Sequence, residues 1–250
     1  MIPALLLGRK GSVGFPGKNT TLVLGRPMAQ YPMLSANASA LVDRVYLSTD
    51  DEQLKEIAMR CNTEVIDRPA YLCTKEALGE DAYVHGYKEI MKRNHNADIE
   101  MIILLFCNAP TFLPSQINEG IEALRNDKEL DSAITVSQYN WYSPVRARRI
   151  GTDGRVYPFI PFESYQDHLE KINCDRDAQG DCWFADVCVS VVRPRCLEKI
   201  ENGILPQKWM GQKIYPIKNW GGLDVDAEFQ MGQVEFWFQA HGFTESRLPY

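Results

Sequence analysis

The chain has 250 residues, of which 45% are hydrophobic and 24% are charged. A chain of this length and composition can bury a full core and form one large α/β domain. Its formal net charge of −6 at pH 7 argues against a general nucleic-acid binder, because positive charge is concentrated only at residues 9–18 and 146–149. An acidic chain that concentrates positive charge in one loop is expected to bind a small anionic ligand there.

The start of the chain and its cysteines bear on location. The apolar run at residues 2–7 is too short for a signal peptide and for a membrane span. The seven cysteines form no C-x-x-C pair, and their odd number does not suit a disulfide framework. We therefore expect a cytoplasmic protein with no membrane partner.

Apolar and amphipathic segments alternate through the first half of the chain. Strands are predicted at residues 4–8, 44–48, 63–66, 101–106 and 132–137. Helices are predicted at residues 28–37, 52–61, 80–93 and 116–125, with Asp50 as the cap of the second. This alternation, with continuous apolar strands, predicts a mostly parallel sheet covered by helices on both faces. In such sheets the ligand binds beyond the carboxyl ends of the strands.

The pattern changes after residue 137. Residues 145–149 and 155–159 flank a Gly-Thr-Asp-Gly turn and predict a β-hairpin. A polar stretch follows before residues 183–192 predict a buried strand, and a final helix is predicted at residues 229–241. We interpret residues 138–182 as an insertion that forms an acceptor pocket or a dimerisation surface. Its aromatic side chains fit either use, or an ordinary core.

Residues 5–19 read LLLGRKGSVGFPGKN and predict a phosphate-binding loop after a buried first strand. Glycines let the backbone approach a ligand so that successive N–H groups converge on an anion. The loop offers glycines (Gly11, Gly14, Gly17), cations (Arg9, Lys10, Lys18) and uncharged donors (Ser12, Asn19). Its spacing matches neither a Walker A loop nor G-x-G-x-x-G. The alternative is a solvated basic turn between strand and helix.

Four motifs resemble one known family. They are GRKGSVGFPGKN, YLSTDDEQLKEIA, DRPAYL and, near the C-terminus, LDVDAEF. In this order they resemble the acylneuraminate cytidylyltransferases, which make CMP-sialic acid and related CMP-sugars. The resemblance implies a single cytidylyltransferase domain over residues 1–250, with a Rossmann-like nucleotidyltransferase fold. It also implies a homodimer and Mg²⁺-dependent transfer of CMP from CTP to an acceptor hydroxyl, with release of pyrophosphate.

The resemblance also assigns roles to residues. CTP binding falls on the loop residues Arg9, Ser12, Lys18 and Asn19, on Arg68, and on Ala77 and Gly79 beside the cytosine. From the chemistry of the residues themselves we add the loop residues Lys10 and Gly11, and Asn108 as a hydrogen-bonding group for the nucleotide. Asp224 and Asp226 match the late Asp-x-Asp metal ligands, and Lys18, Arg9 and Asp226 are the expected catalytic residues. Carboxylates one residue apart on an extended strand point to opposite faces, so sharing Mg²⁺ requires a turn or a bridging water. The alternative role for Asp226 is to cap the final helix.

The chain departs from the family pattern at expected nucleotide contacts and in the acceptor half. The positions of a family Gln and Arg are Phe106 and Phe112, and Val13 replaces a lysine of the loop. Asp186 replaces part of an aromatic-Asn-Gly motif and would repel a carboxylated sugar unless it binds hydroxyls or is neutralised. We predict acceptor binding by Asp186, Arg146 and Arg148. The two arginines fit an anion clamp and an exposed hairpin face equally well.

The sequence therefore predicts a CTP-dependent cytidylyltransferase that acts on a sialic acid-like or 3-deoxy-ulosonic acid-like sugar. One rival keeps the nucleotide and takes a phosphonate or phosphate acceptor, which needs a stronger anion clamp. Another is a catalytically idle nucleotide-binding subunit, which the altered segment at residues 106–112 suggests. A glycosyltransferase is less consistent with an Asp-x-Asp motif so near the C-terminus.

Overall fold

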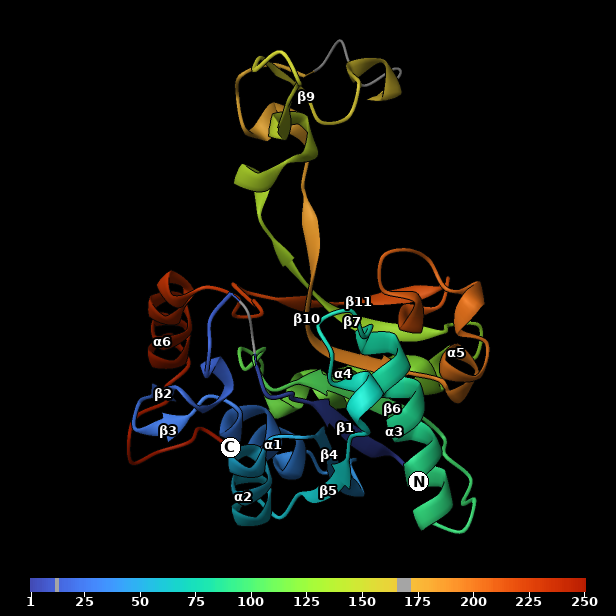
Figure 1. Ribbon diagram of the computed structural model, residues 1–250. Coiled ribbons are helices and arrows are strands. Elements are labelled where there is room, and N and C mark those ends of the chain that lie inside the picture. Colours follow the sequence, from blue (N-terminus) through green and yellow to red (C-terminus); the bar gives the residue numbers. More distant parts are fainter. Residues whose placement is uncertain (12–13, 166–171) are drawn as a thin grey trace.

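The computed structural model describes residues 1–11, 14–165 and 172–250. Its centre is a seven-stranded sheet in the order β11-β7-β10-β6-β1-β4-β5 (Figure 1). The strands are β1 (Pro3–Leu7), β4 (Arg44–Thr49), β5 (Glu64–Asp67), β6 (Ile102–Phe106), β7 (Ser132–Gln138), β10 (Trp183–Val192) and β11 (Ile214–Asn219). Only β10 runs antiparallel to its neighbours in this sheet. The predicted α/β fold with a mostly parallel sheet is confirmed.

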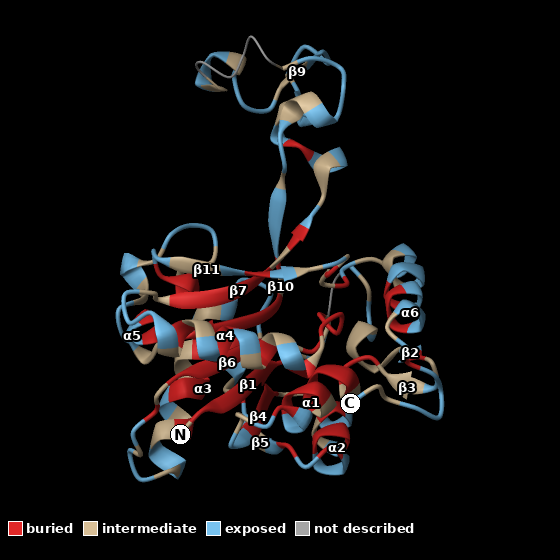
Figure 2. Cartoon of the chain, turned by 180° about the vertical axis from the view of Figure 1, so that it is seen from behind, coloured by how far each residue is buried: buried red, intermediate tan, exposed pale blue. Residues whose placement is uncertain are grey.

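Helices cover both faces of the sheet. One face carries α1 (Gln30–Ala38), α2 (Glu52–Arg60) and α4 (Pro114–Asn126), and the other carries α3 (Gly79–Arg93) and α5 (Pro194–Glu198). Side chains of β1 alternate between the two cores: Ala4 and Leu6 enter the first, and Leu5 and Leu7 enter the second. Figure 2 shows the resulting buried layer through the sheet and its covering helices. None of the helices in the described ranges is long and apolar enough to cross a bilayer.

A third, smaller core joins the C-terminal helix to the N-terminal half. The helix α6 (Met231–Ala240) and the short hairpin of β2 (Leu22–Val23) and β3 (Arg26–Pro27) enclose it. Tyr31 of α1 stacks on Phe238 of α6 with ring centroids 4.1 Å apart. This packing holds the C-terminal segment beside the loop that follows β1.

Every strand and helix predicted within residues 1–137 is present, with ends displaced by one or two residues. The predicted cap of α2 is wrong, because Asp51 rather than Asp50 accepts from the backbone N–H of Gln53, at 2.9 Å. Asp50 instead accepts from the backbone N–H of Lys10, at 2.8 Å. The sequence reasoning also missed the edge strand β11, whose central Pro216 is typical of edges rather than sheet interiors.

Within the described residues, 139–165 and 172–182 form an arm that stands out from the body between the ends of β7 and β10 (Figures 1 and 2). Its hairpin of β8 (Arg148–Ile150) and β9 (Val156–Pro158) confirms the predicted turn, with Gly154 at a φ of +74°. At the base of the arm the register of β10 on β7 shifts between Ala185 and Ser190. Val187 has a φ of +53° within this bulge. The bulge lets β10 leave the sheet and continue into the arm.

Candidate functional site

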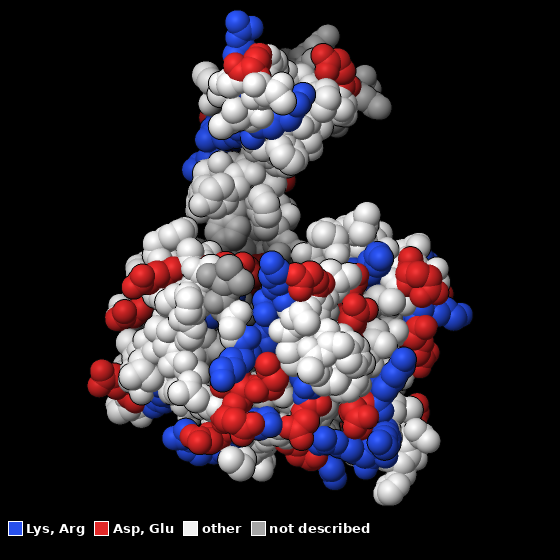
Figure 3. Space-filling model, in the orientation of Figure 1, with Lys and Arg blue, Asp and Glu red and all other residues white. Residues whose placement is uncertain are grey.

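A pocket of 360 Å³ lies beyond the carboxyl ends of β1, β5 and β6. It joins the N-terminal glycine loop, the start of α3 and the segment that precedes α6. Its lining comprises Leu7, Gly8, Arg9, Gly14, Lys18, Asn19, Arg68, Leu72, Ala77, Leu78, Gly79, Ala82, Phe106, Asn108 and Asp226. Figure 3 shows lysine and arginine atoms along a hollow in the middle of this face of the body. The predicted nucleotide residues Arg9, Lys18, Asn19, Arg68, Ala77, Gly79 and Asn108 therefore share one cavity.

Two predicted loop residues lie outside the pocket lining. Lys10 and Gly11 are exposed, and Lys10 is fixed through its backbone N–H on Asp50. Ser12 and Val13 fall outside the described residues. Gly8 lies where the chain leaves β1 and enters the loop, and a Cβ at this residue would lie only 2.7 Å from Cys107 Sγ. The backbone at the end of β1 thus approaches the β6 segment as closely as glycine permits.

The glycines of the loop serve two different purposes. Gly11 and Gly17 have φ values of +79° and +74°, so they supply the left-handed turns that the sequence predicts. Gly14 allows a close approach, since a Cβ there would lie 2.9 Å from the backbone oxygen of Asp226. The loop therefore folds directly against the C-terminal Asp-x-Asp segment.

Lys18 joins these two segments chemically. Its ammonium donates to the backbone oxygen of Val225 at 2.7 Å and to Asp226 Oδ1 at 2.5 Å. The Lys18 side chain is 11% exposed, whereas that of Asp226 is 71% exposed. Arg9 makes longer contacts, with its guanidinium 3.4 Å from the backbone oxygen of Cys73. Both cations thus border the cavity, and Asp226 is the carboxylate in its lining that pairs with one of them.

Of the two carboxylates in the Asp224–Asp226 segment, that of Asp226 lines the pocket and that of Asp224 does not. Gly221 has a φ of +67° just before it, and Gln230 Oε1 accepts from the backbone N–H groups of Asp226 and Ala227 at 2.7 and 2.8 Å. Burial, and then the charge of Asp226, raise the pKa of Asp224 above its usual range. Two mutually repelling carboxylates favour a divalent cation between them.

The donor set fits Mg²⁺ bound together with a nucleotide. Within the described ranges no group of three or more His, Cys, Asp or Glu side chains could enclose a metal ion. Mg²⁺ commonly takes one or two carboxylates and completes its shell with phosphate oxygens and water. Asp226 does not cap the final helix, since α6 begins after Gln230 and the Asp226 carboxylate faces Lys18.

Arg68 and Asn19 are two further polar residues in the lining of the pocket. Arg68 is 8% exposed and donates to the backbone oxygen and the Oγ of Ser48, at 2.6 and 3.2 Å. Its burial lowers the pKa of the guanidinium. Asn19 Oδ1 is buried without a hydrogen-bond partner in the described structure. A buried acceptor of this kind is satisfied by a ligand N–H or O–H group, or by water.

The segment that departs from the family pattern has two distinct environments. Phe106 lines the pocket and packs edge-on against Tyr83, with ring centroids 5.4 Å apart. Phe112 is fully buried in the core and takes no part in the pocket. Asn108 does line the pocket, but its amide N–H donates to the backbone oxygen of Val225 at 3.0 Å. Its role is therefore at least partly to hold the Asp-x-Asp segment.

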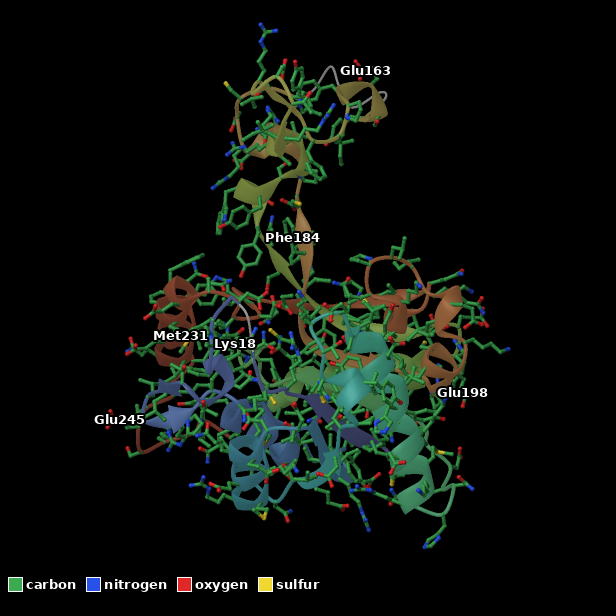
Figure 4. The ribbon with its side chains drawn as sticks, viewed as in Figure 1. Lys18, Glu163, Phe184, Glu198, Met231 and Glu245 are labelled. Carbon is green, nitrogen blue, oxygen red and sulfur yellow. The ribbon has the colours of Figure 1, made fainter. Side chains whose placement is uncertain are left out.

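The predicted acceptor residues are separated in the structure. Asp186 is only 5% exposed and its carboxylate is hydrogen-bonded inside the protein, which argues against the predicted contact with an acceptor. Arg146 and Arg148 lie on the arm, where Arg146 donates to Gln179 and Arg148 lies 5.7 Å from the centroid of Phe162. Figure 4 places Lys18 in the body and Glu163 at the far end of the arm. The arm arginines do not reach the pocket of their own chain.

A second, larger pocket of 620 Å³ lies between the base of the arm and α6. It is mainly aromatic, and its lining is Tyr139, Trp141, Tyr142, Trp220, Gly221, Leu223, Phe229, Gln230, Gly232, Gln233, Phe236 and Trp237. Several of these rings are exposed, including Trp141, Tyr142 and Phe236. Exposed aromatic patches of this kind mark interaction surfaces.

Sequence reasoning missed Gln230 and the polar residues around Asp186. Gln230 carries no motif signal, since a glutamine before a helix is common. Gly221 and Gly222 were the available signal, because paired glycines ahead of an Asp-x-Asp segment indicate a tight backbone approach.

Comparisons with known proteins agree with this geometry. The protein-family model described as Cytidylyltransferase matches residues 3–149, which is more than half of the chain. The chain is 25% identical over 168 residues to CMP-N,N'-diacetyllegionaminic acid synthase of Legionella pneumophila, covering 66% of this chain and 68% of that protein. It is 27% identical to pseudaminic acid cytidylyltransferase of Campylobacter jejuni, covering 64% and 66%. It is 21% identical to N-acylneuraminate cytidylyltransferase of Oncorhynchus mykiss, covering 93% of this chain but only 49% of that protein.

Solved structures share the fold. CMP:2-keto-3-deoxy-manno-octonic acid synthetase in complex with CTP superposes with a TM-score of 0.66 at 18% identity, covering 96% of this chain and 98% of that one. The 4-diphosphocytidyl-2C-methyl-D-erythritol synthase of Anaerococcus prevotii superposes with a TM-score of 0.61 at 13% identity, covering 95% and 96%. The predicted nucleotidyltransferase fold and the predicted family resemblance are both confirmed.

Proposed function

Because the chain belongs to the cytidylyltransferase family, we propose that it transfers CMP from CTP to a hydroxyl of an acidic sugar and releases pyrophosphate. The observation that carries the proposal is the link between Lys18 and Asp226, which brings the glycine loop and the Asp-x-Asp segment to one pocket. The similar proteins named for legionaminic, pseudaminic and N-acylneuraminic acids support an acidic sugar acceptor of the sialic acid or 3-deoxy-ulosonic acid class.

The reaction proposed is a direct in-line displacement. The acceptor hydroxyl oxygen forms a bond to the α-phosphorus, the bond to the pyrophosphate oxygen breaks, and the hydroxyl proton is lost. Such a transfer depends chiefly on positioning and on offsetting negative charge. Lys18 and Arg9 supply fixed positive charge beside the phosphates, and the loop supplies backbone N–H groups.

Asp224 and Asp226 would hold Mg²⁺ when CTP is bound. The bound cation would offset charge on the phosphate oxygens and on the leaving pyrophosphate. Asp226 pairs with Lys18 in the ligand-free protein, so we expect this pair to rearrange when the nucleotide binds. The high exposure of the Asp226 side chain makes that rearrangement inexpensive.

One part of the pocket suits a pyrimidine nucleoside. Asn19 Oδ1 needs a donor, which a ribose hydroxyl or the cytosine amino group provides. Arg68 and the backbone of residues 77–79 border the same region, and Phe106 offers an apolar wall. We assign the surroundings of Arg68, residues 77–79 and Phe106 to the nucleoside, and the surroundings of Lys18 to the triphosphate.

We also propose a homodimer in which the arm of one copy reaches the other. Arg146 and Arg148 contact other residues of the arm and do not line the pocket of their own chain, so an acceptor role at that pocket requires a second copy. Exposed aromatic side chains at the base of the arm, such as Trp141 and Tyr142, supply apolar surface for such contact. The seven cysteines are free, which suits the reducing cytoplasm where we expect the protein to act.

The proposal is tested by incubating the purified protein with CTP, Mg²⁺ and a panel of acidic sugars, phosphonates and sugar phosphates, and measuring pyrophosphate release. We expect release with one acidic sugar and none from an Asp226→Ala variant. Release only with a phosphonate or phosphate would establish the alternative acceptor. CTP binding without release for any acceptor would support the idle nucleotide-binding subunit.

A further inference from the structure

Asp186 is a buried carboxylate that four hydrogen-bond donors surround. Its Oδ1 accepts from the hydroxyl of Thr135 and from the backbone N–H of Cys188, the latter at 3.1 Å. Its Oδ2 accepts from Ser137 Oγ at 2.7 Å and from the Asn219 amide at 3.0 Å. A buried charge is costly unless it is fully hydrogen-bonded, and this one is.

The donors come from three strands that are neighbours in the sheet. Thr135 and Ser137 lie on β7, Cys188 lies on β10 and Asn219 ends β11. Asp186 itself sits in the bulge where β10 turns into the arm. The carboxylate therefore joins the strand ends at the base of the arm.

The same cluster fixes the backbone that leads to the metal-binding carboxylates. Ser137 Oγ accepts from the backbone N–H of Gly222 at 2.9 Å while donating to Asp186. A Cβ on Gly222 would overlap both Asp186 Oδ2 and the Asn219 amide nitrogen, so the chain passes directly over the carboxylate. Asp224 follows two residues later.

We propose that Asp186 is a positioning residue that presets the Asp224–Asp226 segment for Mg²⁺ and thereby sets how much Mg²⁺ the enzyme requires. The inference rests on the proposed function. It assigns Asp186 no contact with CTP or with the acceptor, in contrast to the role predicted from the sequence. Removing a group that orients a metal ligand without contacting the metal itself typically lowers metal affinity by about 10- to 100-fold.

The substitution Asp186→Asn tests this positioning role most directly. Asp186→Asn keeps the shape of the side chain but places an NH₂ group where one oxygen stands. On the Oδ1 side that group would face the backbone N–H of Cys188, which cannot accept a hydrogen bond. On the Oδ2 side it would face the Asn219 amide, which could accept only by turning over and losing its hydrogen bonds with the backbone oxygen of Thr111 and the backbone N–H of Trp220. Either arrangement breaks hydrogen bonds of the cluster, and its Oδ2 side, with Asn219, lies under Gly222.

The matched controls lie at the other end of β7. Asp131 is also largely buried, with a carboxylate that accepts from Arg195 and from two backbone N–H groups, those of Gln212 and Lys213. Ser132 Oγ donates to the backbone oxygen of Met210. Asp131→Asn and Ser132→Ala should therefore lower stability without reaching the Asp-x-Asp segment.

The experiment measures CTP binding by calorimetry with and without Mg²⁺, and pyrophosphate release as a function of Mg²⁺ concentration, on the full chain. For Asp186→Asn we expect metal-free CTP affinity near that of the wild type. We expect the gain in affinity on adding Mg²⁺ to fall about tenfold or more, and the half-saturating Mg²⁺ concentration to rise by the same factor. Excess Mg²⁺ should recover most of the rate.

Ser137→Ala is the milder variant should Asp186→Asn fail to fold, because it removes only the hydroxyl that links Asp186 to Gly222. The inference is overturned if both site variants match their controls in Mg²⁺ dependence, or if they lose metal-free CTP binding as well. Wild-type protein that binds CTP more tightly with Mg²⁺ but releases no pyrophosphate would refute the proposed transfer and leave the positioning role measurable. Wild-type protein that binds no CTP would refute both.

Discussion

Lys18→Met tests whether the cation that links the two loops serves catalysis more than stability. A cation and a phosphate oxygen about 4 Å apart attract by about 4 kcal/mol at an effective dielectric constant of about 20. Removing a preorganised group of this kind typically costs about 10²- to 10³-fold in rate. We therefore expect kcat/KM for CTP to fall by about that factor, in steady-state assays of pyrophosphate release.

The expected loss of stability is small. The ion pair with Asp226 contributes about 1 kcal/mol or less, because the Asp226 side chain is 71% exposed. The hydrogen bond to the backbone oxygen of Val225 adds about 1 kcal/mol. A total loss of about 2 kcal/mol lowers the Tm of a chain of this size by roughly 4–8 °C. Calorimetry of the ligand-free protein measures this directly.

Lys55→Met is the matched control. Lys55 Nζ lies 2.8 Å from both Glu52 Oε1 and Asp67 Oδ1, on the surface of α2 and outside the pocket. This variant should show a small change in Tm and full activity. If Lys18→Met kept more than about a tenth of the wild-type kcat/KM, the placement of the phosphates beside Lys18 would be wrong.

Three further predictions concern the surroundings of the pocket. The pKa of Asp224 is raised in the folded protein, so its ionised form lowers the stability once the pH rises through that pKa. We therefore expect Asp224→Asn, measured in EDTA, to raise the Tm at pH 7 and to leave it unchanged at a pH below the usual carboxyl range. Phe112→Ala should lower the free energy of unfolding by about 3–5 kcal/mol in urea titrations, whereas a retained stability would contradict its burial in the core. Gly8→Ala should cost about 1–3 kcal/mol in the same titrations, because its methyl group would lie 2.7 Å from atoms of both Cys107 and Leu54.

Local sequence determined most of the architecture. The apolar runs of β1, β4 and β6 alternate with amphipathic helices, and periodicity is a local property that predicts which segments are buried on both faces. The edge strand β11 escaped prediction because Ile217 is its one fully buried residue and it includes Pro216, so no clean alternation is visible. Its position is fixed by pairing with β7, which no local pattern encodes.

The composition of the pocket was also readable from the sequence, because its loop carries an unusual density of glycine and positive charge. Arg9, Lys18, Asn19 and Arg68 line the same cavity, as the motifs predict. What the motifs do not encode is distance across the fold. Lys18 and Asp226 are 208 residues apart in the chain, and only tertiary packing brings their side chains to 2.5 Å.

The environment of the Asp186 carboxylate was determined by the tertiary structure alone. From the sequence Asp186 was assigned to the acceptor because it stands where the family resemblance places an aromatic-Asn-Gly motif. In the fold it lies at a β-bulge, where donors from β7, β10 and β11 converge on its carboxylate. Sequence determines which groups are available and which segments are buried, whereas the register of strands distant along the chain determines which of those groups meet.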